Sequence, residues 1–149
     1  MKDSISEMLN FEKTVSTKHH FIEINEVFPH EKVMENRLDG LLTYINSLAP
    51  HIVIPSIVVT SENVIIDGHH RFHALKKLGF SKIPVHSINY LNDKIITHDD
   101  KKKMVSKDNI IKNALEKNLM EPKSTMHHVR INNNLYPIIL LSKLVYMEK

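Results

Sequence analysis

The residues best suited to chemistry stand in one short stretch, 64–79, which reads VIIDGHHRFHALKKLG. The apolar strand Val64–Ile66 is predicted to end in a tight turn at Asp67 and Gly68, and an amphipathic helix then runs to Gly79. A helix that begins directly after such a turn leaves backbone N–H groups free, and these groups attract anions together with the helix dipole. The stretch therefore favours a phosphate or nucleotide site.

Four side chains and a glycine give this turn its predicted chemistry. Arg71 can bind phosphate oxygens through the fixed fork of its guanidinium group. We expect Gly68, His69, His70 and Arg71 to bind nucleotide phosphates. Asp67 can place a hydrated Mg²⁺ ion, which prefers one or two carboxylates together with phosphate oxygens. The alternative is an ordinary Asp-Gly turn with solvated histidines, which is common turn chemistry.

The composition is that of a globular chain. With 149 residues, 42% of them hydrophobic and 25% charged, one domain with its own core is expected. The formal net charge of +3 is too small to indicate a nucleic-acid partner. The absence of cysteine excludes disulfides, zinc thiolate sites and cysteine nucleophiles. We expect a cytoplasmic protein, because no signal peptide or membrane-spanning stretch is evident.

The hydrophobic pattern predicts an α/β or α+β fold with a small mixed sheet and flanking helices. Residues 1–20 are expected to form a loose or partly helical lead-in, and residues 21–149 a single domain. Pro55 divides the β-branched run 52–60 into two pieces or places it at an edge, and this run is predicted to pair with 64–66 as a hairpin. Further strands are predicted at 21–24, 85–90 and 95–96.

Three more helices are expected, all of them supported by apolar spacing. Arg37–Leu48 is predicted to begin after an N-cap at Asn36, and a second helix after an N-cap at Asp108. The apolar stretch Tyr136–Tyr146 is predicted to pack against the core as a terminal helix that follows Pro137.

The sequence around the turn resembles the ParB/sulfiredoxin superfamily, and most closely its free L-serine kinases, some ADP-dependent and some ATP-dependent. The residues that carry the resemblance are the run D-G-H-H-R-x-x-A-L-x-x-L-G and the Ile83-Pro84-Val85 that follows it. Two further motifs strengthen the resemblance. Pro29-His30-Glu31 matches a segment whose Glu is the general base of the serine kinases, although from the sequence alone Glu31 is equally an acid placed near a helix N-terminus. Ser124-Thr125-Met126-His127 matches a late S-T-x-H segment that holds serine, but Glu121 stands where a second Pro is frequent.

The resemblance implies transfer of a phosphoryl group from ATP or ADP, with Mg²⁺, to the hydroxyl of L-serine to give O-phospho-L-serine. Glu31 would accept the hydroxyl proton. Thr125 and His127 would orient the amino acid, and Lys123 and Ser124 would assist. The partners are then L-serine and an adenine nucleotide. The donor (ATP, ADP or CTP), the acceptor and the oligomeric state stay open.

Other functions known on this fold are less well supported. A ParB-like regulatory protein that binds DNA would need a basic surface and a helix-turn-helix module, and neither is evident. A sulfiredoxin-type reductase needs a cysteine. A nuclease has no hydrolytic constellation here beyond Asp67, Glu31 and scattered histidines, and the histidines lack the spacing of a metal site.

Overall fold

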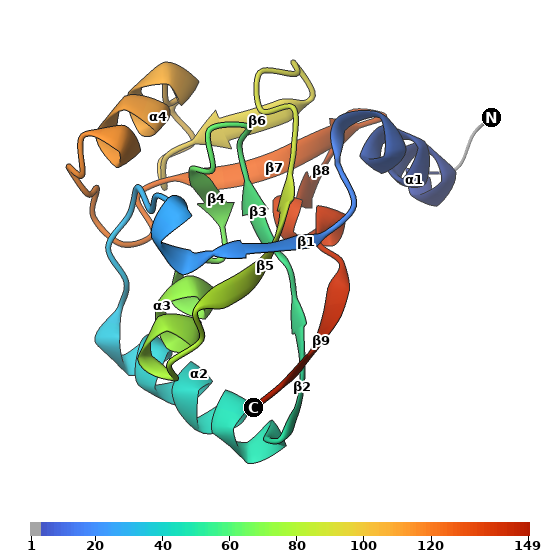
Figure 1. The fold of residues 1–149 in the computed structure, drawn as a ribbon. Coiled ribbons are helices and arrows are strands. Elements are labelled where there is room, and N and C mark those ends of the chain that lie inside the picture. Colours follow the sequence, from blue (N-terminus) through green and yellow to red (C-terminus); the bar gives the residue numbers. More distant parts are fainter. Residues whose placement is uncertain (1–3) are drawn as a thin grey trace.

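The computed structural model describes residues 4–149. It is a mixed α/β fold, as predicted (Figure 1). In chain order the elements are α1 (Ser4–Val15), β1 (His20–Glu23), the 3₁₀ helix η1 (Ile24–Glu26), α2 (Glu35–Leu48), β2 (His51–Pro55), β3 (Ile57–Val59), β4 (Ile65–Asp67), α3 (His69–Lys77), β5 (Lys82–Ser87), β6 (Ile95–His98), α4 (Lys107–Leu115), β7 (Met126–Ile131), β8 (Asn134–Pro137), the 3₁₀ helix η2 (Ile138–Leu141) and β9 (Leu144–Glu148).

A small mixed sheet with the strand order β1-β5-β3-β4 forms the middle of the molecule. β3 runs parallel to β5, whereas the other two pairs are antiparallel. The predicted hairpin is confirmed, because β3 pairs with β4 and Val58 stands opposite Asp67. The predicted break at Pro55 is confirmed as well, since β2 ends there and pairs with β9 in a separate two-stranded sheet.

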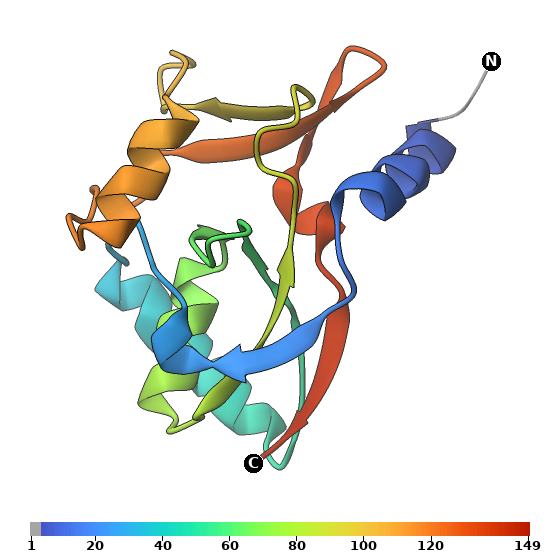
Figure 2. The same ribbon diagram turned by 45° about the horizontal axis from the view of Figure 1, so that its top comes forward.

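The central sheet is covered on both faces at β3 and β4, and this explains why these two strands are almost continuously apolar. Ile57, Val59 and Ile65 point into one core, beneath α2 and α3. Val58 and Val64 point into a second core, which the sheet β6-β7-β8, α1 and α4 cover. Figures 1 and 2 show the two covering layers on opposite sides of the central strands.

Both predicted N-caps were wrong by two residues. α2 begins at Glu35 after Met34, and the side chain of Asn36 accepts a hydrogen bond from the backbone of Arg37 instead of capping the helix. α4 begins after Ser106, whose hydroxyl accepts from the N–H of Asn109. A serine hydroxyl is as good a cap as the carboxylate of Asp108, so residue type alone does not decide between these two nearby positions.

The predicted terminal helix at Tyr136–Tyr146 was wrong. This stretch ends β8, forms η2 and then begins β9. Periodicity does not separate a short apolar strand from a helix, and here the long-range pairing of β9 with β2 decides the outcome.

At the N-terminus, the first three residues of the predicted lead-in lie outside the described residues. The helix α1 follows them, with Phe11 and Val15 buried in the second core. Within residues 4–149, no helix combines the length and apolar character needed to cross a membrane.

Candidate active site

A cleft of about 430 Å³ opens where the β4–α3 turn meets two distant segments. One is the segment 29–34 between η1 and α2, and the other is the loop 121–125 before β7. The residues that line the cleft are Glu31, Arg37, Leu41, Pro55, Ile66, Asp67, Gly68, His69, His70, Arg71, Lys123, Thr125 and Ile139. Eight of the ten predicted site residues are among them, although they come from three parts of the sequence.

The segment that carries Glu31 is tied to the loop before β7 by backbone hydrogen bonds. The N–H of Lys32 donates to the carbonyl of Met120, and the N–H of Met120 donates to the carbonyl of His30. This short parallel bridge places Glu31 directly against the loop. The predicted base and the predicted substrate-binding loop are thereby held together, although about ninety residues separate them.

The Glu31 carboxylate is buried and accepts several hydrogen bonds. Its Oε1 accepts from the N–H of Lys123 at 2.6 Å, and its Oε2 lies 2.7 Å from the hydroxyl and 3.4 Å from the N–H of Thr125. Burial raises the pKa of Glu31, while these hydrogen bonds and the charge of Lys123 lower it. A carboxyl group with a raised pKa and a fixed orientation is suited to proton transfer near neutral pH.

The β4–α3 turn has the glycine turn and helix start that its sequence predicts. Gly68 has φ +112°, and a Cβ built on it would lie 2.9 Å from Nη2 of Arg71. The first α-helical hydrogen bond is donated by Phe72 to the carbonyl of Gly68, so the N–H groups of residues 69–71 have no partner inside the helix. Only a residue without a side chain at position 68 leaves room for the guanidinium beside these donors.

Arg71 is held in place but keeps a donor unused. Its Nη2 donates to the carbonyl of Ser56 at 3.2 Å and to Oδ2 of Asp67 at 3.3 Å. Its buried Nε has no hydrogen-bond partner within the described part of the chain. Arg71 lines the cleft, and its guanidinium group is a donor that fits a phosphate group.

His69 and His70 both line the cleft, and each ring also makes a hydrogen bond inside the protein. The Nε2 of His69 accepts from the N–H of His30 at 3.1 Å, and the Nε2 of His70 accepts from the N–H of Met34 at 3.0 Å. Burial lowers the pKa of both imidazoles, so each is neutral with its hydrogen on Nδ1. The two rings thus fasten the segment 30–34 to α3, and they offer no positive charge to a ligand.

The four predicted substrate-binding residues divide into two pairs. Lys123 and Thr125 line the cleft. The hydroxyl of Ser124 instead donates to the carbonyl of Glu121 at 2.6 Å. His127 is buried in β7, where its Nε2 lies 2.8 Å from the hydroxyl of Tyr90. Neither Ser124 nor His127 is among the lining residues.

A magnesium ion that accompanies nucleotide phosphates fits the donors at the turn. Asp67 lines the cleft with a side chain that is one-third exposed, and only its Oδ2 is engaged with Arg71. A single carboxylate is sufficient when phosphates and waters supply the other ligands. No cluster of three or more metal-binding side chains was found among residues 4–149.

The sequence analysis did not assign the apolar residues that shape the cleft or Arg37. Leu41 and Arg37 come from α2, Pro55 from β2 and Ile139 from η2. Nothing in their local sequence marks them, because they reach the cleft only through packing of these elements. His30 was also unassigned, although it stands beside Glu31 and is fully buried.

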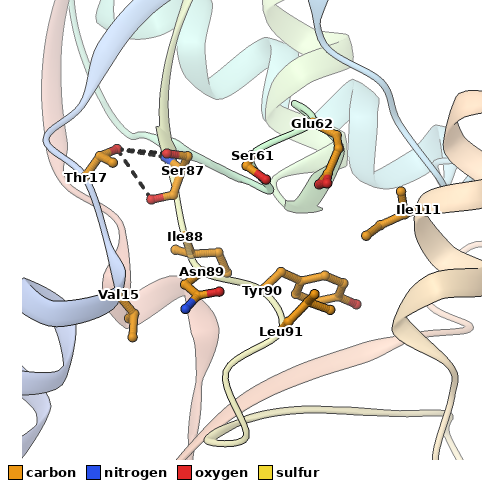
Figure 3. Close-up of a pocket in the computed structure, with 10 residues that line it drawn as sticks. All are labelled: Val15, Thr17, Ser61, Glu62, Ser87, Ile88, Asn89, Tyr90, Leu91 and Ile111. Carbon is orange, nitrogen blue, oxygen red and sulfur yellow. Dashed lines mark hydrogen bonds between the residues drawn. The ribbon is translucent and has the colours of Figure 1, made fainter.

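A second pocket of about 380 Å³ lies away from the predicted site residues (Figure 3). The figure shows Thr17 bonded to Ser87 at one end and Ile111 of α4 at the other. Tyr90 lines this pocket, while its hydroxyl bonds to His127. None of the lining residues is a predicted site residue.

Three curated relatives of this chain are named L-serine kinases, and a fourth is named a ParB-like protein. An ATP-dependent L-serine kinase of Staphylothermus marinus is 30% identical over 95 residues, which cover 59% of this chain and 38% of the relative. An ATP-dependent L-serine kinase of Desulfurococcus mucosus is 36% identical over 77 residues, which cover 50% of this chain and 30% of the relative. The chain therefore spans only about a third of the length of these two relatives.

Solved structures support the fold. A free serine kinase variant in complex with ADP superposes with a TM-score of 0.64 at 13% identity, over 81% of this chain and 92% of that one. SbnI from Staphylococcus aureus, truncated at its C-terminus, gives a TM-score of 0.60 at 16% identity, over 83% and 88% of the two chains.

The family assignment rests on a family profile that matches more than half of the chain. The profile of the ParB N-terminal domain matches residues 6–99, from α1 through the β4–α3 turn to the end of β6. With the mixed sheet and the glycine turn as described, the chain belongs to the ParB N-terminal domain family.

Proposed function

We propose that this chain is a free L-serine kinase, which transfers a phosphoryl group from ATP or ADP to the serine hydroxyl. One observation carries the proposal: the buried carboxylate of Glu31 and the anion-binding turn at Gly68 and Arg71 line the same cleft. Such a cleft can hold a proton acceptor on one side of a hydroxyl group and a phosphate on the other. The similarity to curated L-serine kinases favours serine as the acceptor.

In the proposed reaction, the N–H groups that begin α3 and the guanidinium of Arg71 bind the nucleotide phosphates. Asp67 would hold Mg²⁺, which supplies charge neutralisation on the phosphates. Lys123 and Arg37 line the cleft with cationic side chains and are available to the serine carboxylate. Glu31 accepts the hydroxyl proton while the oxygen forms its bond to phosphorus and the bond from phosphorus to the nucleotide breaks.

The test is phosphorus NMR of the purified chain with Mg²⁺ and L-serine, in parallel samples that contain ATP, ADP or CTP. We expect a phosphoserine signal with one adenine nucleotide. Glu31→Gln should lower the rate about 10²-fold to 10⁴-fold, which is the usual contribution of a general base. Glu35→Gln is the matched control, because it removes an exposed carboxylate four residues away, and its rate should stay unchanged.

Two results would contradict the proposal. Nucleotide binding without phosphoserine in any sample would exclude serine as the acceptor, and binding of DNA that depends on nucleotide would then indicate a regulatory protein. Equal rates for Glu31→Gln and the unaltered chain would exclude Glu31 as the base.

A further inference from the structure

Three buried side chains beside the cleft form one continuous chain of short contacts. Nδ1 of His30 lies 2.7 Å from the carbonyl oxygen of Ile65, and Nε2 of the same ring lies 2.9 Å from Oγ1 of Thr125. Oγ1 of Thr125 lies 2.7 Å from Oε2 of Glu31. His30, Glu31 and Thr125 are 0%, 6% and 8% exposed, so water does not replace any of these contacts.

These contacts require more hydrogens than the groups carry when His30 is neutral and Glu31 is ionised. A carbonyl oxygen only accepts, so Nδ1 of His30 must bear a hydrogen. The contacts from Nε2 to Oγ1 and from Oγ1 to Oε2 need one hydrogen each, but the hydroxyl of Thr125 supplies only one. One further proton is therefore needed, either on Nε2 of His30 or on Oε2 of Glu31.

We propose that His30, Thr125 and Glu31 form a proton relay, in which one proton is shared between imidazole and carboxylate through the hydroxyl of Thr125. With the proton on Glu31, Oε2 donates to Oγ1 and Oγ1 donates to Nε2. The proton of Oε2 then moves to Oγ1, while the hydrogen of Oγ1 moves to Nε2. Two O–H bonds break, one O–H and one N–H bond form, and the products are an imidazolium and a carboxylate. Oε2 and Nε2 are 3.7 Å apart, so the charges that result form an ion pair.

The relay rests on the proposed function for its catalytic meaning. Transfer of the shared proton to His30 regenerates the Glu31 carboxylate, and that carboxylate then accepts the proton of the serine hydroxyl. His30 is a positioning residue, because it acts through Thr125 and Glu31. Thr125 was predicted to orient serine, but both of its hydroxyl contacts are made inside the protein.

The electrostatic surroundings place the proton on Glu31 when no ligand is bound. Burial lowers the pKa of His30 to about 4 and raises the pKa of Glu31. His69 of α3 and His127 of β7 face the His30 ring with centroid distances of 4.6 and 6.0 Å, and Lys123 of the loop faces Glu31. The rings of His69 and His127 are themselves neutral, so burial is what disfavours a positive charge on His30, and the shared proton rests on Glu31.

NMR of the full chain without nucleotide or serine tests the relay directly. The signals are the ring ¹⁵N shifts of His30 and the side-chain carboxyl ¹³C shift of Glu31, followed between about pH 4 and pH 9. We expect a hydrogen on Nδ1 throughout and one common set of apparent midpoints for the two groups, because a strongly coupled pair titrates as a unit.

The variants separate a relay from mere proximity. Thr125→Ser keeps the hydroxyl and should keep the common midpoints, whereas Thr125→Val should separate them. Thr97→Val is the matched control, since it removes another buried hydroxyl, which contacts Tyr90 rather than His30. Glu31→Gln tests the relay without a change at Thr125. In this variant Nε2 of His30 should remain a hydrogen-bond acceptor, and the titration midpoint of His30 should fall.

Independent midpoints in the unaltered chain, or a bare Nδ1 at neutral pH, would overturn the relay. In the serine kinase assay, Thr125→Val should lower kcat about 10-fold to 100-fold, and Thr125→Ser should retain most of it. Common midpoints in a chain that makes no phosphoserine would support the relay and contradict the proposed function. Phosphoserine formation with independent midpoints would support the proposed function and contradict the relay.

Discussion

Glu31 and Arg71 line the same cleft but differ in how far the protein satisfies their hydrogen-bonding groups. Both oxygens of Glu31 are hydrogen-bonded to the loop at 123–125, and the neighbouring His30 has a partner on each ring nitrogen. Arg71 keeps a buried Nε without a partner among the described residues, and its other contacts go to a carbonyl and to Asp67.

This difference between the Glu31 side and the Arg71 side of the cleft matches the chemistry expected of each side. A group that moves a proton must be held in one geometry and shielded from water, because its pKa depends on burial and on fixed neighbours. A group that binds an anion must keep donors free until the anion arrives. We therefore expect the Glu31 side to respond to pH and the Arg71 side to respond to nucleotide.

The largest expected effect concerns acid and the Glu31 side. Burial depresses the pKa of His30 from 6.5 to about 4, so the unfolded chain binds the proton first and stability falls as pH drops below about 6.5. The unfolding free energy of the unaltered chain should therefore fall between pH 7 and pH 5. In His30→Asn, this fall should be smaller by about 2 kcal/mol. Urea unfolding followed by circular dichroism measures this, with the exposed His51→Asn as control.

Glu31 sharpens the same test, because its contribution has the opposite sign. Its pKa is raised in the folded state, so protonation on acidification stabilises the fold. Glu31→Gln should make the loss of stability with acid steeper. Equal acid dependence in the unaltered chain and in both site variants would show that this side of the cleft is not insulated from solvent.

The next effect concerns the Arg71 side and nucleotide binding. Arg71→Lys keeps the positive charge but removes the fork of donors, and it should weaken ATP or ADP binding about 10-fold to 100-fold. Calorimetric titration measures this loss. Lys76→Ala is the control, because it removes a cation from the last turn of the same helix, and its affinity should stay unchanged. Equal losses in the two variants would indicate general attraction by positive charge rather than a defined site.

The smallest effect concerns the shape of the turn. Gly68→Ala places a Cβ 2.9 Å from Nη2 of Arg71 at a φ of +112°, and it should lower stability by about 1–2 kcal/mol. Gly40→Ala is the opposite case, since nothing lies within 4 Å of its added Cβ in the helix α2, and it should raise stability by about 0.5–1 kcal/mol. Thermal unfolding compares the two, and a neutral Gly68→Ala would mean that the turn relaxes without strain.

The local part of this structure was predictable from sequence. The turn between β4 and α3 follows from an apolar strand, a glycine and an amphipathic helix, and each of these signals extends over a few residues. Pro55 divided its β-branched run for a reason that is equally local, because proline cannot donate to a sheet. The resemblance to serine kinases rested on the motif in this turn and on two other short motifs, at 29–31 and 124–127.

Contacts between distant segments could not be predicted in this way. The stretch Tyr136–Tyr146 satisfied a helical pattern, but Val145 pairs with Ile54 and draws the chain into a strand. His69 and His70 have the residue types of phosphate ligands, but their Nε2 atoms accept backbone hydrogens from residues 30 and 34. A ring nitrogen binds whichever donor the folded chain brings to it.

The sequence by itself thus determined which residues could do chemistry at the glycine turn, because a strand, a turn and a helix that follow one another need no distant partner. Only the tertiary structure decided that Glu31, His30 and Thr125 share a proton, since their hydrogen bonds join residues more than ninety positions apart. Packing of the two cores around the central sheet brings these segments together, and burial then sets their pKa values.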